Sequence, residues 1–326
     1  MPSIPFVCYE TPYCVWDDDP KQRNIEYIQG IDPEFFKTSV LAFGQLLDDD
    51  VKARHAATGL RLLYTHSLET LLALICAMVQ APHSVFAWLI KYREPHLKRL
   101  IDDISKRKRV KHLLNIDHLT WESLSNLVHQ FVILEDKEKE QKIKTGFGRF
   151  WRFSASQYLN DISHQEYNSI KHALRVQSSG HVLSIGLEHE YGVAPPQDEM
   201  HPVMASKYGS VFLTPASLGE DKISFGVKDN STGWHPQSLI YGIQLVSNSI
   251  SNIKSFLLAS HGTDPSTLQW YWPQDLSLLD LGWLKQAPGS GSTSFGPYIN
   301  EDELFFPTKD EILKHYDRDD PTRENS

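Results

Sequence analysis

Apolar residues recur at helical spacing over most of the chain. The spacing predicts helices over 35–47, 51–80, 85–92, 97–104, 121–134, 153–176 and 236–260. The longest of these, 51–80, is apolar nearly all round in its second half. A helix of that kind belongs at the centre of a bundle, where neighbours contact it on several sides.

After residue 176 the period of the pattern changes from about 3.6 to 2. Three short alternating runs, 181–187, 210–214 and 222–227, are typical of strands in a small antiparallel sheet or hairpin. The sequence therefore predicts a mainly α fold, a helical bundle with a small antiparallel β insertion (α+β).

Three regions follow from this pattern. Residues 1–34 carry Pro2, Pro5, Pro12 and Pro20 without a sustained period, so we expect an irregular N-terminal extension. Residues 35–262 form the expected bundle, with the β insertion at about 180–228. Residues 263–326 form a tryptophan-containing extension that ends in a polar, disordered tail.

Composition narrows the class of protein. The 326 residues are 40% hydrophobic and 11% aromatic, enough for a substantial core. A net charge of −9 disfavours uniform coating of nucleic acid or anionic membrane, so such a partner must meet a local patch.

The cysteine content and the length of the apolar runs indicate the compartment and the cofactors to expect. Three cysteines without paired spacing support neither a disulfide framework nor a thiolate zinc site, and a reducing cytoplasm fits them best. The apolar run 68–79 is shorter than the roughly 20 residues that span a bilayer. We therefore expect a cytoplasmic protein with no membrane contact, no metal and no cofactor.

The predicted helix 153–176 concentrates polar groups on one face. Asp161, His164, Asn168, Arg175 and either Lys171 or His172 follow one stripe at helical spacing. An amide, imidazoles and two cations on one face equip this helix for chemistry, although a solvated outer face has the same pattern.

The order of elements and the segment Tyr167 to His172 resemble the HEPN-like helical bundle proteins. Active members of that family carry an Arg, a polar residue and a His a few residues later, at the centre of a metal-independent ribonuclease. Here Asn168 and His172 match, while Tyr167 stands where the Arg is expected. The resemblance implies an RNA-directed protein, and the tyrosine favours a degenerate ribonuclease that binds without cutting.

The residues themselves allow such chemistry. Histidine is the natural side chain for a general base, so His172 could serve as one, and Lys171 and Arg175 are cations for a phosphate. Glu69 lies in the apolar run and needs a partner, so we expect it to be buried and paired with a basic or amide group on 153–176. The predicted catalytic set is His172, Asn168, Lys171 and Glu69.

A basic segment provides the second indication of a polyanion. Residues 91–152 hold 15 Lys and Arg against 9 Asp and Glu. The predicted nucleic-acid surface consists of Lys106, Arg107, Lys108, Arg109, Lys111 and Arg175. It requires the run 106–111 to lie on the same side of the fold as His172.

A non-catalytic hypothesis stays open beside this one. Asn168 and His172, four residues apart, can instead hydrogen-bond within the bundle or across the seam of a homodimer. The protein would then be a structural or regulatory bundle that acts through dimerisation or protein–protein contacts, without RNA.

Overall fold

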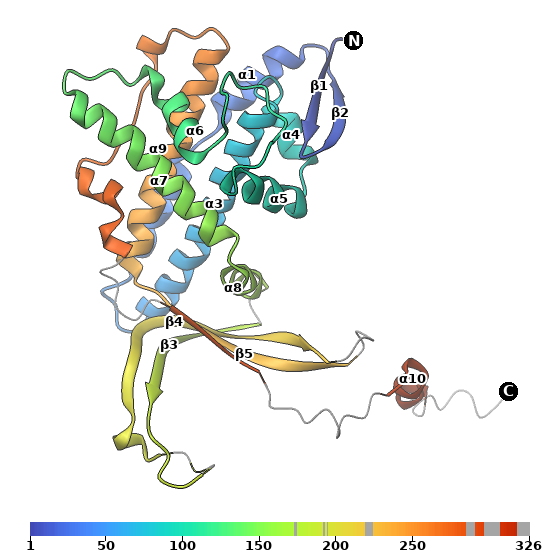
Figure 1. The fold of residues 1–326 in the computed structure, drawn as a ribbon, viewed down its shortest axis with the longest axis vertical. Coiled ribbons are helices and arrows are strands. Elements are labelled where there is room, and N and C mark those ends of the chain that lie inside the picture. Colours follow the sequence, from blue (N-terminus) through green and yellow to red (C-terminus); the bar gives the residue numbers. More distant parts are fainter. Residues whose placement is uncertain are drawn as a thin grey trace, which may run out of the picture.

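The structure of the chain combines α-helices with antiparallel strands (Figure 1). It is a computed structural model that describes residues 1–172, 175–191, 193, 195–218, 224–284, 291–296 and 307–317. The helices are α1 (Pro20–Gly30), α2 (Glu34–Gly44), α3 (Ala53–Gln80), α4 (Val85–Lys91), α5 (Glu94–Ser105), α6 (Trp121–Val128), α7 (Lys137–Tyr158), α8 (Asp161–Lys171), α9 (Pro236–Ser260) and α10 (Lys309–Asp317). The strands are β1 (Ser3–Cys8), β2 (Thr11–Trp16), β3 (Val176–Ile185), β4 (His201–Ser217), β5 (Phe225–Gly233) and β6 (Gly291–Phe295). The predicted mixture of helices with a small antiparallel sheet is confirmed.

Helix α3 lies at the centre of the helical part. Its second half is buried on all sides, and Trp88, Trp121 and Trp151 are fully buried in the same core. By length and composition α3 is apolar enough to cross a membrane, but 72% of its most apolar stretch is buried inside the protein. Central helices of globular cores have the same composition.

Small residues allow helices to approach α3 closely. A Cβ atom at Gly242 of α9 would come within 2.5 Å of the Tyr64 ring of α3. A Cβ atom at Gly59 of α3 would come equally close to the Phe43 ring of α2. The orientation of Tyr64, which matters below, is therefore fixed by the α3–α9 contact.

The larger sheet has the strand order β3-β4-β5-β6, with every pair antiparallel. β3 pairs with residues 201–212 of β4, and β5 pairs with residues 209–217. The two pairings overlap only over residues 209–212. The sheet is widest there, beneath the helices, and two ribbons diverge from it in Figure 1.

The expectation of an irregular N-terminal extension is wrong in its secondary structure. β1 and β2 form a hairpin in which Pro5 lies opposite Cys14 and Pro12 opposite Val7. α1 follows, with Asp19 as its N-cap and Pro20 in its first turn. Proline is compatible with a two-stranded edge and with the first turn of a helix, so its presence did not exclude regular structure.

The single helix predicted over 153–176 is two helices. α7 ends at Tyr158, and α8 begins after Asn160, whose side chain accepts a hydrogen bond from the Ser163 amide at 3.0 Å. α7 also begins much earlier, in the charged segment 137–152. There Glu140 accepts from Lys137 at 2.9 Å and from Lys144 at 2.7 Å, which are pairs at helical spacing.

The boundaries of the sheet also differ from the prediction. β4 continues well before 210, and β6 comes from the segment assigned to the C-terminal extension. The first two residues of the predicted strand 222–227 lie outside the described residues. A fourth strand from a remote segment has no local signal, since residues 291–295 are mainly Ser and Gly.

A buried histidine makes the stability of the fold pH-dependent. His129 is fully buried; Asn252 donates to its Nε2 at 3.0 Å, and its Nδ1 donates to the Ser125 carbonyl at 2.8 Å. Burial lowers the pKa of His129 to about 4, so the folded state holds it neutral. The unfolded chain, with a pKa near 6.5, takes up this proton first.

We therefore expect the contribution of His129 to the free energy of unfolding to be complete above pH 6.5 and to fall as the pH drops toward 4. The loss from this residue approaches about 3 kcal/mol at the acidic end. Urea denaturation at pH 7 and pH 5 measures it. The variant His129→Gln, which does not titrate, provides the control, and an equally steep pH dependence in that variant would contradict the assignment.

Candidate functional site

Helix α8 lies between α3, α5 and the wide end of the sheet (Figure 1). Its buried face consists of Glu166, Tyr167, Ser169 and Ile170. The predicted polar stripe faces outward: His164 and Asn168 are half-buried, while Lys171 and His172 are exposed. Arg175, between α8 and β3, is exposed as well.

The amide of Asn168 is held by His164, one turn earlier. Asn168 Nδ2 lies 3.1 Å from His164 Nε2, which also lies 2.8 Å from Glu94 Oε1 of α5. Lys98 pairs with the same Glu94 oxygen at 3.0 Å. Burial, and then the Lys98 charge, lower the pKa of His164, which favours its neutral form. His164 therefore links α8 to α5, Asn168 contacts His164 from the same helix, and His172 is not part of this network.

Tyr167, at the position of the expected Arg, contacts Glu69. Its ring is buried, and burial together with a hydrogen bond to Glu69 raises its pKa to about 12. Glu69 is half-buried. The expected partner of Glu69 on 153–176 is therefore corrected: it is a phenol hydroxyl, which carries no charge, instead of a basic or amide group.

The buried carboxylate on α8 is Glu166, which sequence reasoning missed. It is 0% exposed and accepts hydrogen bonds from Arg61 at 2.7 Å and 3.1 Å. Ser210 of β4 donates to its other oxygen at 2.7 Å, and Thr232 of β5 donates at 2.5 Å. The cluster joins α3, α8 and two strands through one carboxylate.

A signal for Glu166 was present in the sequence. It lies four residues after Ile162 and four before Ile170, so it falls on the apolar face of the helix rather than on the polar stripe. A carboxylate on an apolar face needs a cation and donors. The partners came from positions 61, 210 and 232, and no local pattern indicates those contacts.

An open cavity of about 520 Å³ lies where α3 begins and β3 begins. Arg54 and His55 of α3 line it, together with Asp50, Val176 and Ser178. Ser178 Oγ lies 2.7 Å from Thr58 Oγ1, which ties β3 to α3 beside Arg175. The described structure thus places Arg54 and His55 near the end of α8, and both are exposed.

The cations at the end of α8 have no acidic partner in the described residues. Lys171, Arg175 and Arg54 form no ion pair with any described residue. The Lys171 ammonium lies 5.9 Å from the centre of the Tyr167 ring. These side chains are available to an anion.

The basic run 106–111 lies elsewhere. It follows the C-terminal end of α5, whose N-terminal residue Glu94 contacts α8, so a helix of about 16 Å separates the two. Lys106 pairs with Asp102 and Lys108 with Asp103, each at 2.8 Å. Arg107 and Arg109 are exposed, and the Lys111 carbonyl accepts from Gln80. The cavities that this run lines are formed with Tyr9, Gln80 and residues 117–120, and no residue of α8 lines them.

No group of three or more His, Cys, Asp or Glu side chains in the described part of the chain is arranged to hold a metal ion. The chain matches no known protein family, and no curated protein or solved structure is significantly similar to it.

The Glu166 cluster gives a stability prediction. In the variant Arg61→Met the Glu166 carboxylate stays buried without its cation, which should cost about 3–5 kcal/mol. Replacing Glu166 by Gln in the same chain removes the unpaired buried charge, so the double variant should be more stable than Arg61→Met alone. Chemical denaturation at pH 7 measures both.

The matched control is Arg54→Met, the same change on an exposed residue of the same helix. It should alter stability by at most about 0.5 kcal/mol. Equal losses for Arg61→Met and Arg54→Met would show that the buried pair does not fix the α3–α8 junction.

Proposed function

We propose that this protein is an RNA-directed, HEPN-like helical bundle protein that binds RNA at the end of α8. The observation that carries the proposal is the set of exposed cations Lys171, Arg175 and Arg54, which have no acidic partner in the described structure. Arg54 also lines the open cavity beside the start of β3. Uncompensated cations on one surface are the electrostatic requirement for binding a phosphate backbone.

Two histidines add to this surface. His172 at the end of α8 and His55 at the start of α3 are both exposed. A histidine beside a bound phosphate can accept the proton of a 2′-hydroxyl, because its ordinary pKa lies near neutrality. His172 is the group that would act as a base in any metal-independent cleavage.

Binding without cutting is the form of this function that the contacts favour. The position of the expected Arg holds Tyr167, whose buried hydroxyl is engaged by Glu69. A phenol in this state supplies no positive charge to a developing phosphorane, which is the contribution expected from an Arg. Lys171 is the nearest replacement, and its ammonium lies over the Tyr167 ring.

The test measures binding of labelled, structured RNA in the presence of a chelator at several salt concentrations. Binding should weaken steeply with salt, because each neutralised phosphate releases counterions. The double variant Lys171→Gln/Arg175→Gln should flatten the slope of log K against log salt by up to about 0.7 per lost contact on a single strand. His172→Ala should abolish any cleavage that the wild type shows.

The matched control is the variant with Lys106, Arg107, Lys108 and Arg109 all replaced by Gln. It removes more positive charge, but from a site about one helix length from α8, and should leave the slope nearly unchanged. A slope that changes only in this control would place RNA on the basic run. No binding at low salt would remove RNA as the partner.

One observation favours the second candidate, a bundle that acts through homodimerisation. The ribbon of β3 and β4 extends from the body in Figure 1. Val182 and Val203 on its strands and Leu187 and Tyr191 in the connection between them are exposed, Leu187 to 85%. Apolar side chains on a projecting ribbon are typical of a surface that another chain covers.

If a second copy covers this ribbon, the protein should sediment as a dimer at micromolar concentration. Replacing Val182, Leu187, Tyr191 and Val203 by Thr should shift it to a monomer, because the dimer loses its apolar contact. Analytical ultracentrifugation measures the shift. A wild type that stays monomeric at every concentration would exclude this candidate.

A further inference from the structure

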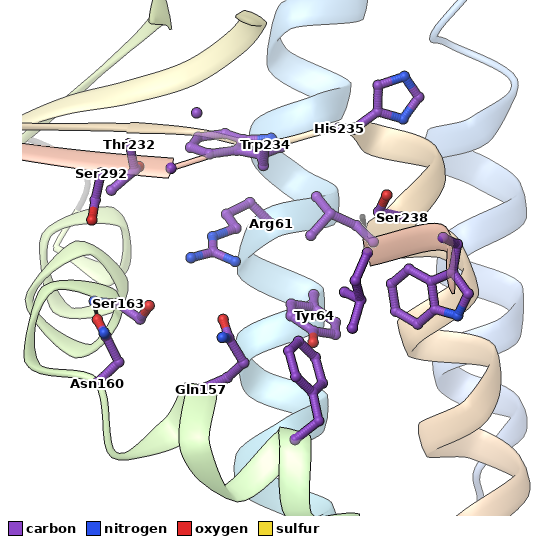
Figure 2. Close-up of a pocket in the computed structure, with 16 residues that line it drawn as sticks. Arg61, Tyr64, Gln157, Asn160, Ser163, Thr232, Trp234, His235, Ser238 and Ser292 are labelled. Atoms are coloured by element: carbon purple, nitrogen blue, oxygen red, sulfur yellow. Dashed lines mark hydrogen bonds between the residues drawn. The ribbon is translucent and has the colours of Figure 1, made fainter. Parts of the chain in front are cut away.

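A second cavity lies between the helices and the sheet, apart from the α8 cations. It has a volume of about 320 Å³ and is formed by α3, the end of α7, the start of α8, the end of β5 and the start of α9 (Figure 2). This volume falls at the small end of the range of ligand sites, about 300–1,000 Å³. The cavity therefore suits a ligand of one or two rings.

The apolar part of the lining is mostly aromatic, with Leu239 and Leu284 beside the rings. Tyr64, Phe153, Trp234 and Trp283 all line the cavity, and the Arg61 guanidinium lies 5.7 Å from the centre of the Trp234 ring. Tyr64 is held in place by its contact with Gly242. Rigid aromatic walls favour a flat ligand, because ring faces stack with little loss of conformational freedom.

A buried donor at this cavity has no partner. The indole N–H of Trp234 is inaccessible to solvent and forms no hydrogen bond in the described part of the protein. The whole residue is only 4% exposed. Its backbone is fixed, since the Trp234 amide donates to Tyr208 and its carbonyl accepts from Ser206. Because this N–H is inaccessible, a ligand in the cavity meets the indole ring and not its donor.

The charge of the cavity is already balanced. Arg61 uses Nε and Nη2 to bind the fully buried Glu166 carboxylate, at 3.1 Å and 2.7 Å. Its Nη1 has no hydrogen-bond partner among the described residues and remains a donor. A phosphate would find little net positive charge here, so the lining favours a neutral ligand.

The polar edge of the cavity can both donate and accept. Gln157 lines it, and its amide has no hydrogen-bond partner in the described structure. Asn160 uses its oxygen to cap α8, which leaves its NH₂ group, and Ser163 and Ser238 add hydroxyls. Figure 2 shows Gln157, Asn160 and Ser163 on the same side as the Arg61 guanidinium. Amides of this kind are matched by ring edges that present a donor next to an acceptor.

We propose that this cavity binds a nucleobase, with the ring among the aromatic walls and its polar edge on the Gln157 amide and Arg61 Nη1. A base combines what the lining requires: it is flat, neutral, of one or two rings, and carries donors and acceptors on its edge. The base can come from a free nucleoside or from an unstacked nucleotide of an RNA chain. The binding of a nucleoside does not depend on the cations at the end of α8.

The test is isothermal titration calorimetry of the full chain with adenosine, guanosine, cytidine and uridine in turn. At least one nucleoside should bind with a stoichiometry of one. Gln157→Leu keeps a side chain of similar size and removes its amide, so binding should weaken about threefold to tenfold, the value of one hydrogen bond. The preference among the four bases should shrink in this variant.

The matched control is Gln165→Leu, the same change at an exposed residue of α8 that does not line this cavity. Nucleoside affinity should not change in this variant. Thermal melting of both glutamine variants verifies that they are folded.

Two further experiments distinguish a base of an RNA chain from a free nucleoside, and this site from the α8 cations. A single-stranded tetranucleotide that displaces the nucleoside indicates a base of an RNA chain, and one that does not indicates a free nucleoside. Lys171→Gln/Arg175→Gln should leave nucleoside binding intact, so a failure of RNA binding at α8 is distinguishable from a failure here. No saturable binding of any nucleoside, or equal affinity in Gln157→Leu and Gln165→Leu, would overturn the proposal.

Discussion

The buried contact between Glu166 and Arg61 determines how the two halves of this protein meet. A carboxylate that is 0% exposed requires a cation and donors, and it finds them on α3, β4 and β5. These partners fix the position of α8 against the central helix and bring the wide end of the sheet beneath it. The α8 cations and the aromatic cavity both lie at this junction, so both depend on the same ion pair.

The two proposed sites divide the recognition of a nucleic acid by its chemistry. The exposed cations around the end of α8 suit the charged backbone, and their attraction is long-ranged and sensitive to salt. The aromatic cavity, in which Glu166 neutralises Arg61, suits an uncharged ring and should respond little to salt. Arg61 contributes to the second site alone, because its charge is already balanced.

Local patterns were sufficient for the long helices and insufficient for contacts between remote segments. The apolar spacing of α3 and α9 indicated both helices close to their actual bounds. The break at Asn160 was not predicted, because the apolar pattern continues through it and a single capping side chain separates the two helices. β6 and the partners of Glu166 depend on pairings across many residues, for which no periodicity exists. The polar stripe of α8 was recognised, but the residue that positions the helix lies on the opposite, apolar face.

The central claim is that RNA contacts the end of α8. Photocrosslinking of a 4-thiouridine-labelled RNA at low salt, followed by mass spectrometry of the peptides, tests it most directly. The account predicts crosslinks to the peptide that contains Lys171 and Arg175 and to the first turns of α3 around Arg54, which lines the open cavity beside β3. Crosslinks confined to residues 106–111, or none above those of an unlabelled control, would contradict it.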